Sequence, residues 1–125
     1  MLHKSFLLLF VLGIASTAFQ CPRKMQKMIY NKIHFDYSSI DIHGLRNGEV
    51  AVDYEFCIPA NEAILQEVLK IDAGIRVMMG SKGRIGCSKS QWLCINSTRS
   101  EGWKEKLHTI AYLEYVDRIQ ETFYE

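Results

Sequence analysis

The chain has 125 residues, with 15 Lys and Arg against 14 Asp and Glu, and therefore a formal net charge of +1. This length accommodates one domain. The nearly neutral balance argues against nucleic acid as a partner, because nucleic-acid binding depends on a basic face that neutralises phosphates.

Residues 1–18 predict an export signal. A short positive end precedes an unbroken apolar run at residues 6–14, which is too short to span a bilayer. Ser16 and Ala18 supply the small side chains that cleavage after Ala18 requires. We expect a mature chain without a transmembrane helix, secreted or periplasmic. A lipid anchor on Cys21 is the alternative, although the glutamine before it is larger than such an anchor requires.

Residues 19–48 predict a β-rich N-terminal extension. Its apolar residues alternate with polar ones, as strands require; they are Ile29, Ile33, Phe35, Tyr37, Ile40 and Ile42. Asn47-Gly48 is a strong hairpin signal and would pair residues 40–46 with the strand that follows.

Residues 49–125 predict an α+β domain, which with the extension forms a single compact domain over residues 19–125. Apolar residues alternate along 49–58, and apolar stripes of helical spacing follow Asn61 and Ser100, both suitable capping residues. The expected strands cover residues 49–58, 75–79, 92–95 and 116–123.

This β-α-β-β-α-β order predicts the ferredoxin-like split βαβ fold, an antiparallel sheet with two helices on one face. The order resembles that of the propeptide-type inhibitors of subtilisin proteases, a likeness of topology alone. The Asn47-Gly48 hairpin conflicts with it, because the strand from Glu49 would already have two neighbours in such a sheet. Either the N-terminal segment packs elsewhere or the strand order differs.

Four cysteines remain after the signal: Cys21, Cys57, Cys87 and Cys94. An even number in a short exported chain predicts disulfides, with three possible connectivities. A four-cysteine metal site is disfavoured because the nearest pair is seven residues apart. We favour the pairs Cys87–Cys94 and Cys21–Cys57. The alternative pair, Cys57–Cys87, would tie the loop at residues 80–90 directly to the sheet.

The loop predicted at residues 80–90 is chemically unusual. Its three glycines permit left-handed turns or a close approach to a ligand, and its basic and hydroxyl side chains suit an anion. The predicted ligand-binding or partner-binding residues are Ser81, Lys82, Arg84 and Lys89. We expect an acidic protein surface or an anionic ligand, with Arg84 the strongest contact because its planar guanidinium can hold a carboxylate through two hydrogen bonds. The alternative is a solvated turn.

No catalytic motif is present, and we expect no catalytic residue, metal or cofactor. A metal site would require His34 and His43 to meet beside Asp36 or Asp41, whereas His108 is expected to be a solvated helix residue. The sequence therefore predicts an exported, disulfide-stabilised binding module: an inhibitor, an immunity-type protein or an envelope accessory protein. The alternative is a small secreted hydrolase or metal-dependent enzyme that uses the histidines and the cationic loop. Residues 96–98 also match an N-glycosylation sequon.

Overall fold

The computed structural model describes residues 22–124, so the predicted export signal and Cys21 lie outside the described residues. Within that range the fold is mixed α+β, with three helices and two antiparallel sheets. The helices are α1 (Arg23–Lys32), α2 (Glu62–Ile71) and α3 (Trp103–Tyr112). The strands are β1 (Leu45–Arg46), β2 (Val50–Ala51), β3 (Asp53–Pro59), β4 (Arg76–Met78), β5 (Gln91–Ser97) and β6 (Ile119–Glu121). None of the helices in this range has the length and apolar character needed to cross a bilayer.

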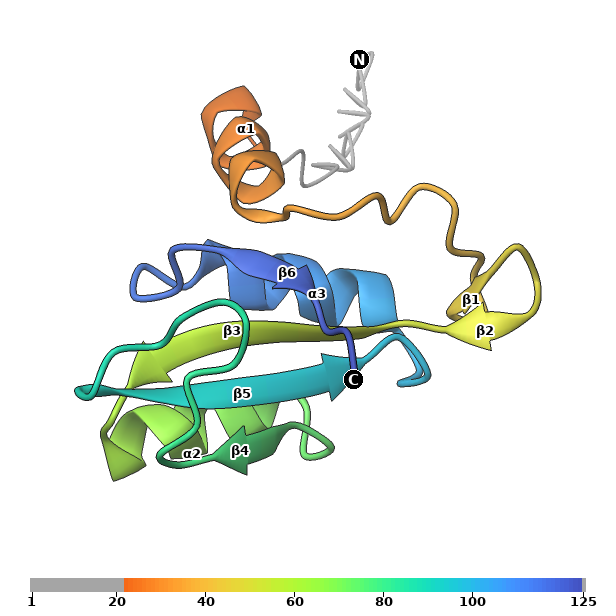
Figure 1. Ribbon diagram of the computed structural model, residues 1–125. Coiled ribbons are helices and arrows are strands. Elements are labelled where there is room, and N and C mark those ends of the chain that lie inside the picture. The colour runs from red at the N-terminus through yellow and green to blue at the C-terminus, as the bar shows by residue number, and fades with distance from the viewer. Residues whose placement is uncertain (1–21, 125) are drawn as a thin grey trace, which may run out of the picture.

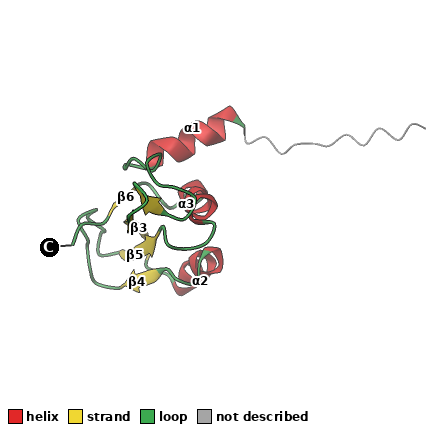
Figure 2. Ribbon diagram, turned by 90° about the vertical axis from the view of Figure 1, so that its right-hand side faces the viewer, coloured by secondary structure: helices red, strands yellow, loops and turns green. Residues whose placement is uncertain are grey.

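The larger sheet has four strands in the order β4-β5-β3-β6, and each neighbouring pair is antiparallel. Helices α2 and α3 cover one face of this sheet, as Figure 2 shows. The long connection from β4 to β5 crosses the opposite face (Figure 1). The sheet therefore has one face packed by helices and one face packed by a loop.

The alternation predicted at residues 49–58 places the largest core side chains. Tyr54, Phe56 and Ile58 of β3 are fully buried beneath the helices. The intervening residues face the loop, since successive residues of a strand point to opposite faces. The helical side of the core is completed by apolar residues of α2 and α3, namely Leu65, Val68, Trp103, Leu107, Ile110 and Ala111.

The start of α2 follows the prediction closely. The side chain of Asn61 accepts a hydrogen bond from the Ile64 amide at 3.1 Å, which satisfies one of the free donors of the first turn. The predicted cap of the next helix is wrong. The residue before α3 is Gly102, in the left-handed conformation with φ 67°, and Ser100 makes no capping bond in α3. The Ser100 hydroxyl instead accepts a hydrogen bond from Lys106.

The hairpin at Asn47-Gly48 is confirmed, and it resolves the conflict over strand order. Strands β1 and β2 pair in a separate two-stranded sheet, while β3 pairs with β5 and β6. The break falls at Val52, whose amide donates to the Thr98 hydroxyl and whose carbonyl accepts from the Thr98 amide, both at 2.9 Å. The single apolar alternation along residues 49–58 is therefore divided between two strands, β2 and β3, that belong to different sheets.

The β-rich character predicted for the N-terminal extension is wrong for its first part, since residues 23–32 form helix α1. The reason is the spacing of Met25 and Ile29, which lie four residues apart and face the core on one side of the helix; Ile33 continues this spacing in the extended residue just after the helix ends. Helix α1 packs against α3. The chain then runs in an extended path, and the His34 amide donates to the Ile119 carbonyl of β6 at 2.8 Å.

Candidate functional site

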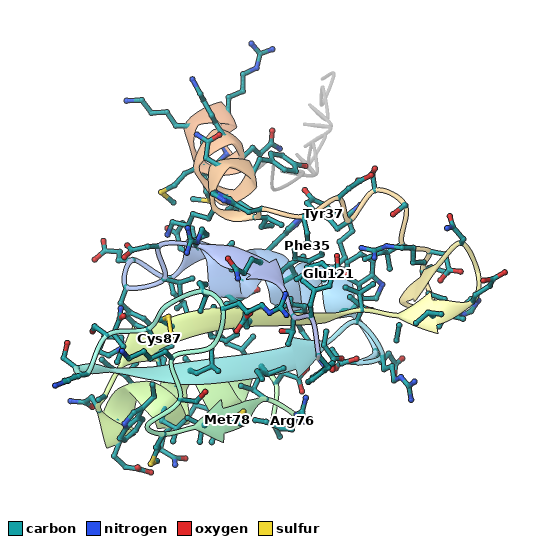
Figure 3. All side chains as sticks on the ribbon, in the orientation of Figure 1. Phe35, Tyr37, Arg76, Met78, Cys87 and Glu121 are labelled. Carbon is teal, nitrogen blue, oxygen red and sulfur yellow. A yellow bond between two sulfur atoms is a disulfide. The ribbon has the colours of Figure 1, made fainter. Side chains whose placement is uncertain are left out.

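The predicted loop lies across the helix-free face of the sheet, between β4 and β5 (Figures 1 and 2). A disulfide joins Cys87 of the loop to Cys57 of β3, with the two Cα atoms 5.6 Å apart. Figure 3 shows the Cys87 sulfur over β3, away from the helices. The loop is therefore fixed covalently to a central strand of the sheet.

The favoured cysteine pairing is wrong, and the alternative bridge is the one present. Cys94 is a free, buried thiol on β5. Its register explains this: Cys57 lies opposite Leu93, and Cys94 lies opposite Phe56, so Cys94 points to the helical face. Burial raises the pKa of the Cys94 thiol to about 12, so it is not a nucleophile near neutral pH. The pairing of Cys21 falls outside the described residues.

A small apolar cluster holds the loop against the sheet. Its buried members, which Cys57 packs against, are Ile85, Cys87, Leu93 and Ile95. Arg118, just before β6, donates a hydrogen bond from Nη2 to the Ile85 carbonyl at 2.8 Å. The second half of the loop is thus held by a disulfide, by apolar packing and by a hydrogen bond from a charged donor.

Gly83 brings the first half of the loop close to the sheet. Its φ is 57°, and a Cβ atom there would lie 2.3 Å from the Glu55 carboxylate and 2.9 Å from a methyl group of Leu93. Glu55 is buried beneath the loop, with Gln120 donating to its carboxylate at 3.4 Å. Glycine at this position therefore has a physical reason, which is close contact with a buried acid.

The predicted contact residues lie on the outside of this fixed loop. Lys82, Arg84 and Lys89 are exposed, and Ser81 is half-exposed. Four hollows among residues 22–124 are lined by other residues, and none of these four side chains contributes to their walls. The loop therefore carries its basic side chains on its outer surface, while its Ile85 and Gly86 border a separate hollow of about 280 Å3.

The two N-terminal histidines line different hollows. His43 borders a hollow of about 870 Å3 between the turn at residues 40–43 and the start of α3. His34 borders another, of about 520 Å3, beside β6. Within residues 22–124 no three His, Cys, Asp or Glu side chains are placed to hold a metal ion. The meeting of both histidines with an acid, which the enzyme alternative required, is not found in this part of the chain.

A serine and a lysine do meet at a partly buried position beside α3, but not in a catalytic arrangement. Lys106 Nζ donates to Ser100 Oγ at 2.7 Å and lies 3.7 Å from Asp72 Oδ2. Burial opposes ionisation of Asp72, but hydrogen bonds from Ser100, the Gly74 amide and Asn96, with the charge of Lys106, hold its pKa below the ordinary value. An ammonium paired with this carboxylate is not available to take a proton from serine. The cluster is a structural link between α2 and α3.

The glycosylation sequon is part of the same buried network. Asn96 is 4% exposed, and its side-chain amide donates to the Tyr54 hydroxyl at 3.0 Å and to Asp72 at 3.1 Å. A glycan on this nitrogen would replace one of its two hydrogens, so at least one of these bonds would be lost, and the sugar would occupy core space. The sequon is therefore inaccessible in the folded protein.

His108 is half-buried, contrary to the expectation of a solvated residue, because α1 and the segment after it cover α3. Its ring contacts Tyr30 and Tyr37 edge-on, at centroid distances of 6.0 and 5.7 Å. Its buried Nε2 has no hydrogen-bond partner among the described residues. Burial and, secondarily, the charge of Lys104 hold the pKa of His108 below its ordinary value, with Glu105 acting in the opposite direction.

Protonation of His108 should therefore destabilise the fold in mild acid. Because the folded-state pKa is below the unfolded-state value of 6.5, the unfolded chain takes up more protons as pH falls through that region. We expect His108→Phe to lose less stability than the wild type between about pH 7 and about pH 5, as measured by urea unfolding. Identical pH dependence in the two proteins would contradict this role.

Comparisons of the chain with protein families, with curated proteins and with solved structures found no match. Three features are relevant: a loop fixed to the sheet by a disulfide, basic side chains on the outside of that loop, and histidines that are kept apart.

Proposed function

We propose that the protein is a small disulfide-stabilised binding module that contacts its partner through the loop at residues 80–90. The observation that carries this proposal is the Cys57–Cys87 bridge, which fixes a glycine-rich, basic loop to the sheet. A loop ordered before binding loses less conformational entropy when it meets a partner. The Arg118 hydrogen bond to Ile85 acts in the same direction.

The chemistry of the loop indicates an acidic partner, either a protein surface or an anionic ligand. Lys82, Arg84 and Lys89 extend from the same short segment, and the segment contains no acid. Basic side chains at the edge of an interface act mainly on the rate of association and on selectivity, and salt screens their effect. Arg84 is distinguished by a guanidinium that can hold a carboxylate through two hydrogen bonds.

The proposal includes an extracytoplasmic location and a finer description of the fold. A structural disulfide fits an oxidising compartment, as does the apolar run at residues 6–14 with its small residues before position 19. In the ferredoxin-like fold the four strands of a β-α-β-β-α-β chain lie in the order 2-3-1-4 or its reverse. The order β4-β5-β3-β6 supports this topology, with α1 and the β1–β2 hairpin as additions.

The test is binding of a polyglutamate peptide, used as a probe of acidic character, by isothermal titration calorimetry at low salt. The double variant Lys82→Glu/Lys89→Glu should bind about tenfold or more weakly than the wild type. A matched control is Lys70→Glu/Arg99→Glu, which changes the net charge equally at exposed positions outside the loop. Equal weakening in both variants would show a response to net charge alone and would contradict the proposed site.

A further inference from the structure

The charge of the chain is divided unevenly between α1 and the rest of the protein. Helix α1 contains four basic residues and no acid, and the first acid of the whole sequence is Asp36. Residues 36–125 contain 10 Lys and Arg against 14 Asp and Glu, a net charge of −4. The nearly neutral net charge of the chain is therefore the sum of a basic helix, α1, and an acidic body, residues 36–125.

Helix α1 presents its charges away from that body. Ile29 is buried against the core and Met25 packs beside it, which fixes the inward face. Arg23, Lys24 and Lys27 are all exposed. Figures 1 and 2 show α1 at one end of the molecule, outside the layer formed by the sheet with α2 and α3.

The orientation of α1 is fixed at its C-terminal end, and its surface is not purely charged. Lys32 Nζ donates to the Leu113 carbonyl after α3 at 2.9 Å, which ties the helix to the body. Met28 is 40% exposed and Tyr30 is 54% exposed, so apolar and aromatic groups accompany the lysines. Because Ile29 and Met25 face the core, contact with an anionic bilayer would depend on charge attraction by the lysines and arginine, with the exposed methionine and tyrosine at the headgroup level.

We propose that α1 docks the protein on a membrane surface rich in anionic lipid. Two observations favour a bilayer over an acidic protein. The basic charge is concentrated on a single helix at one end of the molecule, as a planar surface requires, and an exposed methionine and tyrosine lie on that same helix. One short helix with three exposed cations gives weak, reversible attachment that depends on salt. This surface is separate from the loop at residues 80–90, so the protein on a membrane keeps its partner-binding face available.

The experiment is co-sedimentation of the protein recovered from the exported fraction with two kinds of vesicle, phosphatidylcholine alone and phosphatidylcholine mixed with phosphatidylglycerol. Each lysine or arginine near an anionic surface changes partition about fivefold. The double variant Lys24→Glu/Lys27→Glu should therefore bind the anionic vesicles at least about 25-fold more weakly than the wild type. Lys70→Glu/Arg99→Glu is the matched control and should keep most of the binding; intact mass establishes the N-terminus of each sample.

Several results would overturn the proposal. Binding of the wild type that does not depend on phosphatidylglycerol would indicate insertion through apolar residues and not docking through α1. Equal losses in the two double variants would indicate net charge alone. Alternatively, the wild type binds neither vesicle and forms dimers, and the substitutions Lys24→Glu/Lys27→Glu abolish the dimers. This result would show that α1 contacts the acidic body of a second copy. None of these outcomes alters polyglutamate binding by the loop, so the two proposals fail separately.

Discussion

Replacing Cys57 and Cys87 together by alanine is expected to lower the free energy of unfolding by about 3–4 kcal/mol. The bridge closes a segment with a sequence separation of 30 residues, and restricting a loop of that length removes much of the freedom of the unfolded chain. A small domain has little stability in reserve, so this loss is a large fraction of the total. The variant should also bind polyglutamate more weakly, because the loop must then be ordered on binding.

Urea unfolding of the wild type with and without reductant measures the stability change independently of the substitutions. Peptide mapping after thiol labelling supplies the control. In the native protein Cys94 should resist labelling because it is buried, and it should react once the protein is unfolded without reductant. A loss below about 1 kcal/mol, or labelling of Cys57 and Cys87 in the unreduced protein, would contradict the assigned bridge.

Gly44→Ala should be similarly damaging, with an expected loss of at least about 3 kcal/mol. Gly44 has φ +79°, and a Cβ atom there would lie 1.7 Å from the Thr98 carbonyl oxygen, which is backbone and cannot rotate away. The Thr98 hydroxyl also donates to the Gly44 carbonyl at 2.6 Å, within the network that holds Val52. Relieving the overlap would separate the β1–β2 hairpin from the main sheet.

Gly48→Ala separates the two causes of this loss. Gly48 also has a positive φ, of +73°, but nothing lies within 4 Å of the position its Cβ would take. The substitution Gly48→Ala should therefore lower the free energy of unfolding by the conformational strain alone, about 1 kcal/mol. Thermal unfolding of both variants makes the comparison, and similar melting temperatures would show that the contact with Thr98 is not what requires glycine at position 44.

The parts of the fold that were predictable have local physical causes. Alternation along residues 53–58 specifies a strand with one face in the core, and Asn61 specifies where α2 begins. Helix α1 was missed because Ile33, Phe35 and Tyr37 alternate just after it, and the strand-like pattern was extended back over residues with helical spacing. The Asn47-Gly48 hairpin is predictable, but the sequence does not decide whether it joins the main sheet, since the break at Val52 depends on Thr98, a residue distant in sequence.

The candidate site was predictable as a loop but not in how it is held. Its glycines and lysines are visible in the sequence, and its exposure follows from them. The pairing of Cys57 with Cys87 depends on the register of β3 with β5, because both faces of residues 92–95 are apolar and no alternation shows which way Cys94 points. The contact of Gly83 with Glu55 likewise depends on a chain crossing that local patterns do not encode.

The claim that the loop at residues 80–90 is the contact surface is tested most directly by backbone amide chemical shifts during titration with polyglutamate. We expect the largest shifts on residues 81–89, and we expect these shifts to shrink when Lys82 and Lys89 are replaced by glutamate. Shifts centred on α1 or on the hollow beside His43, with the loop amides unmoved, would contradict it.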